Sequence, residues 1–186
     1  MNTQSTALLV IDVQQSFRQR PYWDESELPQ FIGHLQGLVD RARRTAVPVV
    51  QIFHEEEGDD AFAPQSGFVA TLPELAIEPD AVFRKNVHSA LFARDRDGVT
   101  LESWLRERGI GRVVVTGIRT EQCCETTARH AFDAGFAVRY VTAATLTFAM
   151  TSPSGRRYSP QDIRDRTELV LAGRFADIVA PETALA

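Results

Sequence analysis

The stretch from residue 113 to 129 constrains the fold of this chain most strongly. Three consecutive valines run through a threonine into Gly117, a pattern typical of a buried strand that ends in a tight turn. Thr120 then stands where it can cap a helix that carries Cys123 in its first turn. Free N–H groups and the helix dipole at such a turn stabilise a thiolate and can bind an oxyanion. Cys123 is therefore a candidate nucleophile, although two adjacent cysteines can also be small buried apolar side chains.

Further apolar runs and capping signals predict a regular alternation of strands and helices. Strands are expected at 6–11, 47–53, 81–84, 136–141 and 175–179, and helices at 29–46, 100–108 and 160–173. Strands that alternate with helices in this way form a parallel, doubly wound α/β sheet. No linker or internal repeat interrupts the pattern, so one domain is expected over residues 1–186.

Composition excludes several classes of function. The net charge of −5 gives no support to nucleic-acid binding. No apolar run is long enough to span a membrane, and the first residues lack a signal-peptide pattern. The only two cysteines are adjacent, so a disulfide between them would cross-link no distant parts of the chain. This favours a reducing compartment. We therefore expect a cytoplasmic protein without a nucleic-acid or membrane partner.

Three chemically distinct side chains follow predicted strands. Asp12, Lys85 and Cys123 each lie at or just beyond the carboxyl end of a strand, where open α/β sheets place their active sites. Each alone has a more ordinary explanation: a loop acid, a surface lysine or a buried thiol. Together they form a coherent nucleophilic site in which Asp12 takes the thiol proton and Lys85 lowers the thiol pKa.

The segment 55–80 is expected to be irregular, with the acidic run 55–60 and three prolines. These acids can bind a cation, but a solvated loop is the preferred interpretation. Gly58 is not framed by EF-hand spacing, and no second histidine accompanies His54. Neither a metal ion nor any other cofactor is expected.

Three segments resemble the isochorismatase-like cysteine hydrolase family. Residues 9–17 (LVIDVQQSF) resemble its D-x-Q-x-x-F motif, residues 84–91 (RKNVHSAL) its lysine segment, and residues 117–129 (GIRTEQCCETTAR) its G-x-x-T-x-x-C-V-x-x-T-A-R motif. The segments occur in the family's order, and the similarity extends from about residue 6 to 180.

This resemblance implies both a fold and a site. The fold is a six-stranded, Rossmann-like three-layer arrangement with helices on both faces of the sheet. The site is an Asp12–Lys85–Cys123 triad with a cis peptide between Ile118 and Arg119. The backbone N–H groups of Arg119 and Cys123 would form the oxyanion hole. Family members also form dimers or higher homo-oligomers, so a homo-oligomer is expected.

Two departures from the family pattern bear on the site. Cys124 replaces a common valine, which suggests a role in packing. Arg119 replaces a residue that is often small, so its guanidinium either recognises a substrate carboxylate or points away and leaves only its backbone in use. The candidate substrate contacts are Phe17, His54, Arg119 and Phe148.

The retained thiol narrows the expected reaction. Nicotinamidases of the family carry a D-x-H…H metal segment before the lysine, where this chain has only His54, so nicotinamidase activity is disfavoured. Relatives that hydrolyse the vinyl ether of isochorismate can lack the thiol. Cys123 therefore points to C–N bond hydrolysis through a thioester, with amide, ureido or carbamoyl substrates. The alternatives are a vinyl-ether hydrolase, a redox-responsive thiol protein and a non-catalytic binding scaffold.

Overall fold

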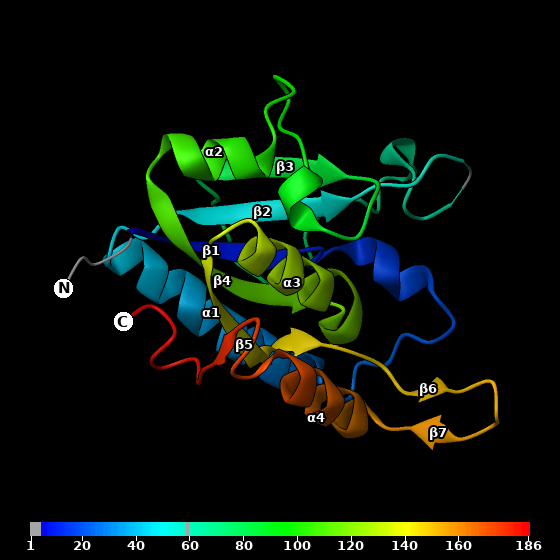
Figure 1. The fold of residues 1–186 in the computed structure, drawn as a ribbon. Helices are drawn as coiled ribbons and strands as arrows, with labels where there is room; N and C mark the ends of the chain where they lie inside the picture. The colour runs from blue at the N-terminus through cyan, green and yellow to red at the C-terminus, as the bar shows by residue number, and fades with distance from the viewer. Residues whose placement is uncertain (1–4, 59) are drawn as a thin grey trace.

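The computed structural model describes residues 5–58 and 60–186, and its centre is a six-stranded parallel sheet (Figure 1). The strand order is β3-β2-β1-β4-β5-β8. The strands are β1 (Ser5–Ile11), β2 (Val49–His54), β3 (Ala81–Lys85), β4 (Ile110–Ile118), β5 (Ala137–Leu146) and β8 (Asp177–Ile178). Chain order reverses between β1 and β4, so the predicted doubly wound α/β fold is confirmed.

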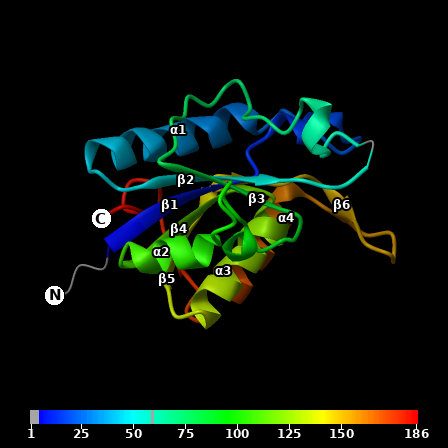
Figure 2. The same cartoon turned by 90° about the horizontal axis from the view of Figure 1, so that it is seen from above.

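Helices cover both faces of this sheet, as Figure 2 shows. They are α1 (Leu28–Arg44), α2 (Leu101–Glu107), α3 (Glu125–Asp133) and α4 (Pro160–Leu171). On one face, apolar residues of α1 such as Leu35 and Leu38 pack in a cluster with Val10 of β1. On the other, Leu105 of α2 and Ala128 of α3 share a second cluster with the opposite sides of the strands. These two cores give the expected three layers.

Several shorter elements connect the main ones. They are the 3-10 turns η1 (Gln15–Gln19), η2 (Pro64–Ser66) and η3 (Ala90–Phe92), the π-helical turn η4 (Thr120–Cys124), and the hairpin strands β6 (Met150–Thr151) and β7 (Arg157–Tyr158). The hairpin, which the sequence did not predict, projects from the body of the molecule (Figure 1). Its two-residue strands are too short to show an alternating pattern.

Two predicted strand ends are wrong. β5 continues to Leu146 instead of ending at 141, because a register shift lets Thr145 and Leu146 pair with the end of β4. The last strand is reduced to Asp177–Ile178.

Among the described residues, no helix is long and apolar enough to cross a membrane.

Strands β1 and β4 approach each other closely where the chain order reverses. Gly117 of β4 pairs with Ile11 of β1 and has a φ of +124°. A Cβ atom at residue 117 would lie 1.9 Å from the carbonyl oxygen of Ile11, which no side chain permits. Glycine therefore lets the carboxyl ends of β1 and β4 meet, and the residues after both strands come together.

Candidate active site

Asp12 follows β1 directly and is fully buried. Its φ of +53° is unusual for a residue other than glycine, although aspartate tolerates it better than most. The backbone N–H donates to the carbonyl of Ile52, which fixes the turn. Oδ2 accepts a hydrogen bond from Lys85 at 2.7 Å, whereas the buried Oδ1 accepts none from the described residues. One carboxylate oxygen is thus free to receive a proton.

The ammonium of Lys85 lies at the centre of the site. Nζ is 2.7 Å from Oδ2 of Asp12, 3.1 Å from Nδ1 of His54 and 3.4 Å from Sγ of Cys123. An ammonium has three N–H donors, and here it has three acceptors. Burial is the largest influence and lowers the pKa of Lys85. The charge and hydrogen bond of Asp12, together with Cys123, outweigh burial and hold this pKa above its ordinary value. Lys85 therefore stays cationic.

Cys123 occupies the π-helical turn η4 that leads into α3. Burial raises the pKa of its thiol most, the charge of Asp12 raises it further, and Lys85 offsets only part of the increase. The prediction that Lys85 makes this thiol easy to ionise is therefore wrong for the resting protein, because burial dominates. The raised pKa favours the neutral thiol, and the carboxylate of Asp12 lies beside it.

The turn that holds Cys123 is anchored differently from the sequence-based prediction. No side chain caps η4, and the Thr120 hydroxyl pairs with that of Thr145 at 2.7 Å. The hydroxyl of Tyr140 donates to the Thr120 carbonyl at 2.7 Å. The predicted helix cap is wrong, because the Thr120 hydroxyl bonds to Thr145 of β5 and not to the backbone of η4. Cys124 is a free, fully buried thiol in the core, as its expected packing role requires.

The implied cis peptide between Ile118 and Arg119 is present. The Arg119 side chain is buried, and its guanidinium lies 2.8 Å from a carboxylate oxygen of Glu121. It also lies over the ring of Tyr22, 4.9 Å from the centroid. The charge of Arg119 is therefore already compensated within the protein, and a substrate carboxylate would have to compete with Glu121.

The remaining substrate-contact candidates lie in different surroundings. His54 joins the triad through Lys85. Phe17 is buried edge-on against Phe62, with ring centroids 5.1 Å apart. Phe148 is almost fully buried and lies 5.2 Å from the ring of Trp23. The two phenylalanines thus belong to aromatic clusters in this conformation.

The donor atoms around Lys85 also resemble a metal-binding set. Ligand atoms of Asp12, His54 and Cys123 lie within 4.8 Å of one another, and such residues bind zinc in many proteins. Yet Lys85 donates hydrogen bonds to all three, so its ammonium fills the space and supplies the positive charge. These residues do not fit a metal ion while Lys85 keeps its place.

The acidic run of the 55–80 segment mostly contacts arginine. Glu55 pairs with Arg84, and Asp60 accepts a hydrogen bond from Arg20 at 2.7 Å. Asp59 lies outside the described residues. The sequence predicted a solvated loop. In the structure, Glu55 and Asp60 of this loop also pair with arginine side chains.

A family model, that of the isochorismatase domain, matches residues 6–174. The chain belongs to the isochorismatase family of hydrolases. It is 32% identical to Nicotinamidase 3 of Arabidopsis thaliana, over 96% of this chain and 86% of that protein. A crystal structure of an isochorismatase-family protein from Chromobacterium violaceum superposes with a TM-score of 0.87 at 29% identity, over 100% of this chain and 94% of the other. N-carbamoylsarcosine amidase from Thermoplasma acidophilum shares the fold, with a TM-score of 0.72 at 21% identity, over 96% and 97% of the chains.

One residue of this isochorismatase-family site was not among the predicted site residues. The buried amide of Gln14 accepts a hydrogen bond from the His54 backbone N–H at 2.8 Å and donates to the His54 carbonyl at 3.0 Å. The signal was visible in the sequence as the Q of the D-x-Q motif. Only the pairing of strands reveals that Gln14 holds the end of β2.

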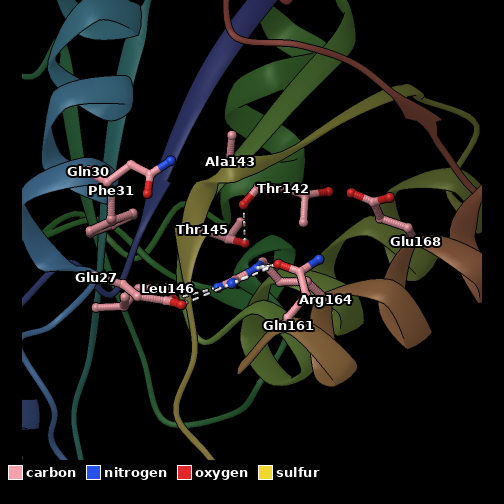
Figure 3. Close-up of a pocket in the computed structure, with 10 residues that line it drawn as sticks. All are labelled: Glu27, Gln30, Phe31, Thr142, Ala143, Thr145, Leu146, Gln161, Arg164 and Glu168. Carbon is pink, nitrogen blue, oxygen red and sulfur yellow. Dashed lines mark hydrogen bonds and ion pairs between the residues drawn. The ribbon is translucent and has the colours of Figure 1, made fainter. Parts of the chain in front are cut away.

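A separate pocket of about 290 Å³ opens between α1, β5 and α4 (Figure 3). Arg164 and Glu27 form a two-pronged ion pair across it, at 2.6 and 3.0 Å. The triad does not line this pocket, whose only described link to the site is Thr145, the partner of Thr120. The Asp12 and Lys85 side chains of this isochorismatase-family chain are, in contrast, fully buried.

Proposed function

We propose that this protein is a cysteine-dependent hydrolase that cleaves a C–N bond of a small substrate through a thioester intermediate. The observation that carries this proposal is the buried contact of a thiol, an ammonium and a carboxylate. Lys85 joins Asp12 at 2.7 Å and Cys123 at 3.4 Å. A nucleophile, its base and a charge that orients both are the elements of covalent catalysis.

The proposed reaction starts from the neutral thiol. Oδ1 of Asp12 takes the proton while Sγ of Cys123 bonds to the substrate carbonyl carbon, and the π electrons move to oxygen. The N–H groups of Arg119 and Cys123 hold the resulting oxyanion. Asp12 then returns the proton to the leaving nitrogen as the C–N bond breaks. Asp12 next takes a proton from a water molecule as the water oxygen adds to the thioester carbonyl carbon. The C–S bond then breaks, the proton returns to Sγ of Cys123, and the acid product leaves.

The proposed substrates are amides, ureido compounds or carbamoyl compounds. The names of the two amide-cleaving relatives support this class for the present chain. Because Glu121 already compensates Arg119, we propose that the part of the substrate near Arg119 is uncharged. Nicotinamide itself is expected to react poorly, because the segment between His54 and Lys85 contains no further histidine.

The alternative functions fit the site less well. A redox-responsive thiol is normally an exposed thiolate, whereas burial raises the pKa of Cys123 and leaves only 7% of the residue exposed. A binding scaffold has no use for the full triad. Vinyl-ether hydrolysis remains the second candidate, since it can proceed without a thiol.

The direct test is a panel of small amides, ureido acids and carbamoyl compounds, including nicotinamide, assayed for ammonia release. Wild-type protein is expected to turn over at least one compound, and Cys123→Ala none. Undiminished turnover by Cys123→Ala would exclude the thioester route and favour thiol-independent chemistry.

A further inference from the structure

We propose that His54 is a positioning residue, which holds the Lys85 ammonium against Asp12 and Cys123 through Nδ1. Its consequence for catalysis rests on the proposed function. His54 and Lys85 are register partners at the ends of the parallel strands β2 and β3, so their side chains project from the same face of the sheet. Nδ1 of His54 and Nζ of Lys85 are 3.1 Å apart.

The buried ammonium of Lys85 has three N–H donors, and His54 supplies the acceptor for the third. Asp12 and Cys123 accept two of the three ammonium protons, and the Lys85 side chain has no access to solvent. Nδ1 of His54 accepts the third. A buried charged donor without an acceptor is strongly unfavourable, so loss of Nδ1 would move Lys85 from its place between the carboxylate and the thiol.

The surroundings of His54 select the required tautomer. With Nδ1 as an acceptor, Nε2 carries the hydrogen and lies 3.3 Å from Oε1 of Glu56. The titratable groups that face His54 are Lys85, Asp12, Glu56, Cys123 and His88, whose ring centroid lies 6.4 Å from that of His54. Burial first, and then the Lys85 charge, lower the His54 pKa. A neutral imidazole is the form that can accept from Lys85.

The backbone of His54 is fixed as firmly as its ring. The Gln14 amide bonds to both its N–H and its carbonyl, and donates to Ser16 as well. Phe62 packs edge-on against the imidazole, with ring centroids 5.9 Å apart. The contacts with Gln14 and Phe62 thus hold the backbone and the ring of His54 in place, as expected of a group that acts through another residue.

The test compares variants that remove or restore the acceptor. His54→Phe keeps a ring without Nδ1, whereas His54→Asn can place Oδ1 near the position of Nδ1. Glu57→Gln is the matched surface control, since Glu57 is exposed. Alkylation of Cys123 by iodoacetamide at neutral pH reports on the thiol without a substrate, with Cys123→Ala as the blank that corrects for Cys124.

We expect His54→Phe to slow Cys123 alkylation about tenfold or more, His54→Asn to restore most of the rate, and Glu57→Gln to match wild type. On an amide substrate, kcat should fall in the same order with little change in KM. If His54→Phe does not fold, His54→Leu and Gln14→Met are compared with His54→Asn in the same assay.

Wild-type alkylation rates in folded variants that lack Nδ1 would overturn the inference. A raised KM with unchanged kcat would also overturn it, because His54 would then contact the substrate. If the alkylation rates follow the expected order but no compound is hydrolysed, the positioning role stands and the proposed function fails.

Discussion

The two adjacent cysteines show how strongly one residue of displacement changes a side chain's environment. Successive residues of a helical turn point about 100° apart. Sγ of Cys123 therefore contacts Lys85 at 3.4 Å, whereas Cys124, in the same apolar cluster, is fully buried. Burial raises the pKa of both thiols, but among the described contacts only Cys123 has an ammonium at hydrogen-bond distance, that of Lys85, which also binds the Asp12 carboxylate.

Replacing Cys123 or Cys124 by alanine should therefore have opposite effects on turnover and on the free energy of unfolding. Cys123→Ala should abolish amide turnover with little change in unfolding free energy, because the residue lies at the edge of the core. Cys124→Ala should keep kcat and lose about 1 kcal/mol of stability, through the small cavity it leaves. Chemical denaturation and steady-state kinetics measure both, and a loss of turnover in folded Cys124→Ala would contradict the assignment.

At the level of elements, the sequence predicts most of the framework because buried strands and amphipathic helices leave strong periodic signals. The helix predicted at 29–46 is observed at Leu28–Arg44, and the strand predicted at 6–11 at Ser5–Ile11. The strands β1, β3 and β4 are parallel, so their carboxyl ends lie at one edge of the sheet. There they bring Asp12, Lys85 and Cys123 together.

What the sequence cannot supply depends on register and burial. The contact of His54 with Lys85 follows from the pairing of β2 with β3, which no local pattern encodes. The high thiol pKa of Cys123 follows from enclosure by segments distant in the chain. Thr120 looks like a helix cap until Thr145 is placed beside it by the extended end of β5.

The close pairing of β1 with β4 at Gly117 predicts a loss of stability when this glycine is replaced. Gly117→Ala should lower the unfolding free energy by about 3 kcal/mol or more, because its Cβ would meet the Ile11 carbonyl oxygen at 1.9 Å and its φ of +124° is strained for alanine. Gly109→Ala, with a φ of +63° but open space around it, is the matched control and should cost less. Equal stability losses in a denaturant titration would contradict the role of the β1–β4 approach.

Across the whole molecule, the enclosed site makes stability depend on alkaline pH. Burial raises the pKa of Cys123, Cys124 and Tyr140 above their ordinary values, so these groups keep their protons in the folded protein. The unfolded chain releases the thiol protons from about pH 9 upward. Since the folded state then binds more protons than the unfolded state, stability falls as pH rises.

The expected result is a decline in unfolding free energy above about pH 9, with each buried thiol adding up to about 1.4 kcal/mol per pH unit. Lys85, whose pKa is also raised, adds to the decline above about pH 10.5, where the unfolded lysine loses its proton. Denaturant midpoints at pH 8 and 10 measure the effect, and Cys124→Ala should flatten it. Stability that is constant or rises over this interval would contradict the enclosed, protonated thiols.

We propose that Cys123 forms a covalent acyl-enzyme, and intact-protein mass spectrometry of an acid-quenched reaction tests this most directly. With a compound that the protein hydrolyses, the wild-type mass should increase by the acyl group, and fragmentation should place the adduct on Cys123. Cys123→Ala should show neither adduct nor turnover. An adduct on another residue, or turnover by Cys123→Ala without any adduct, would contradict the account.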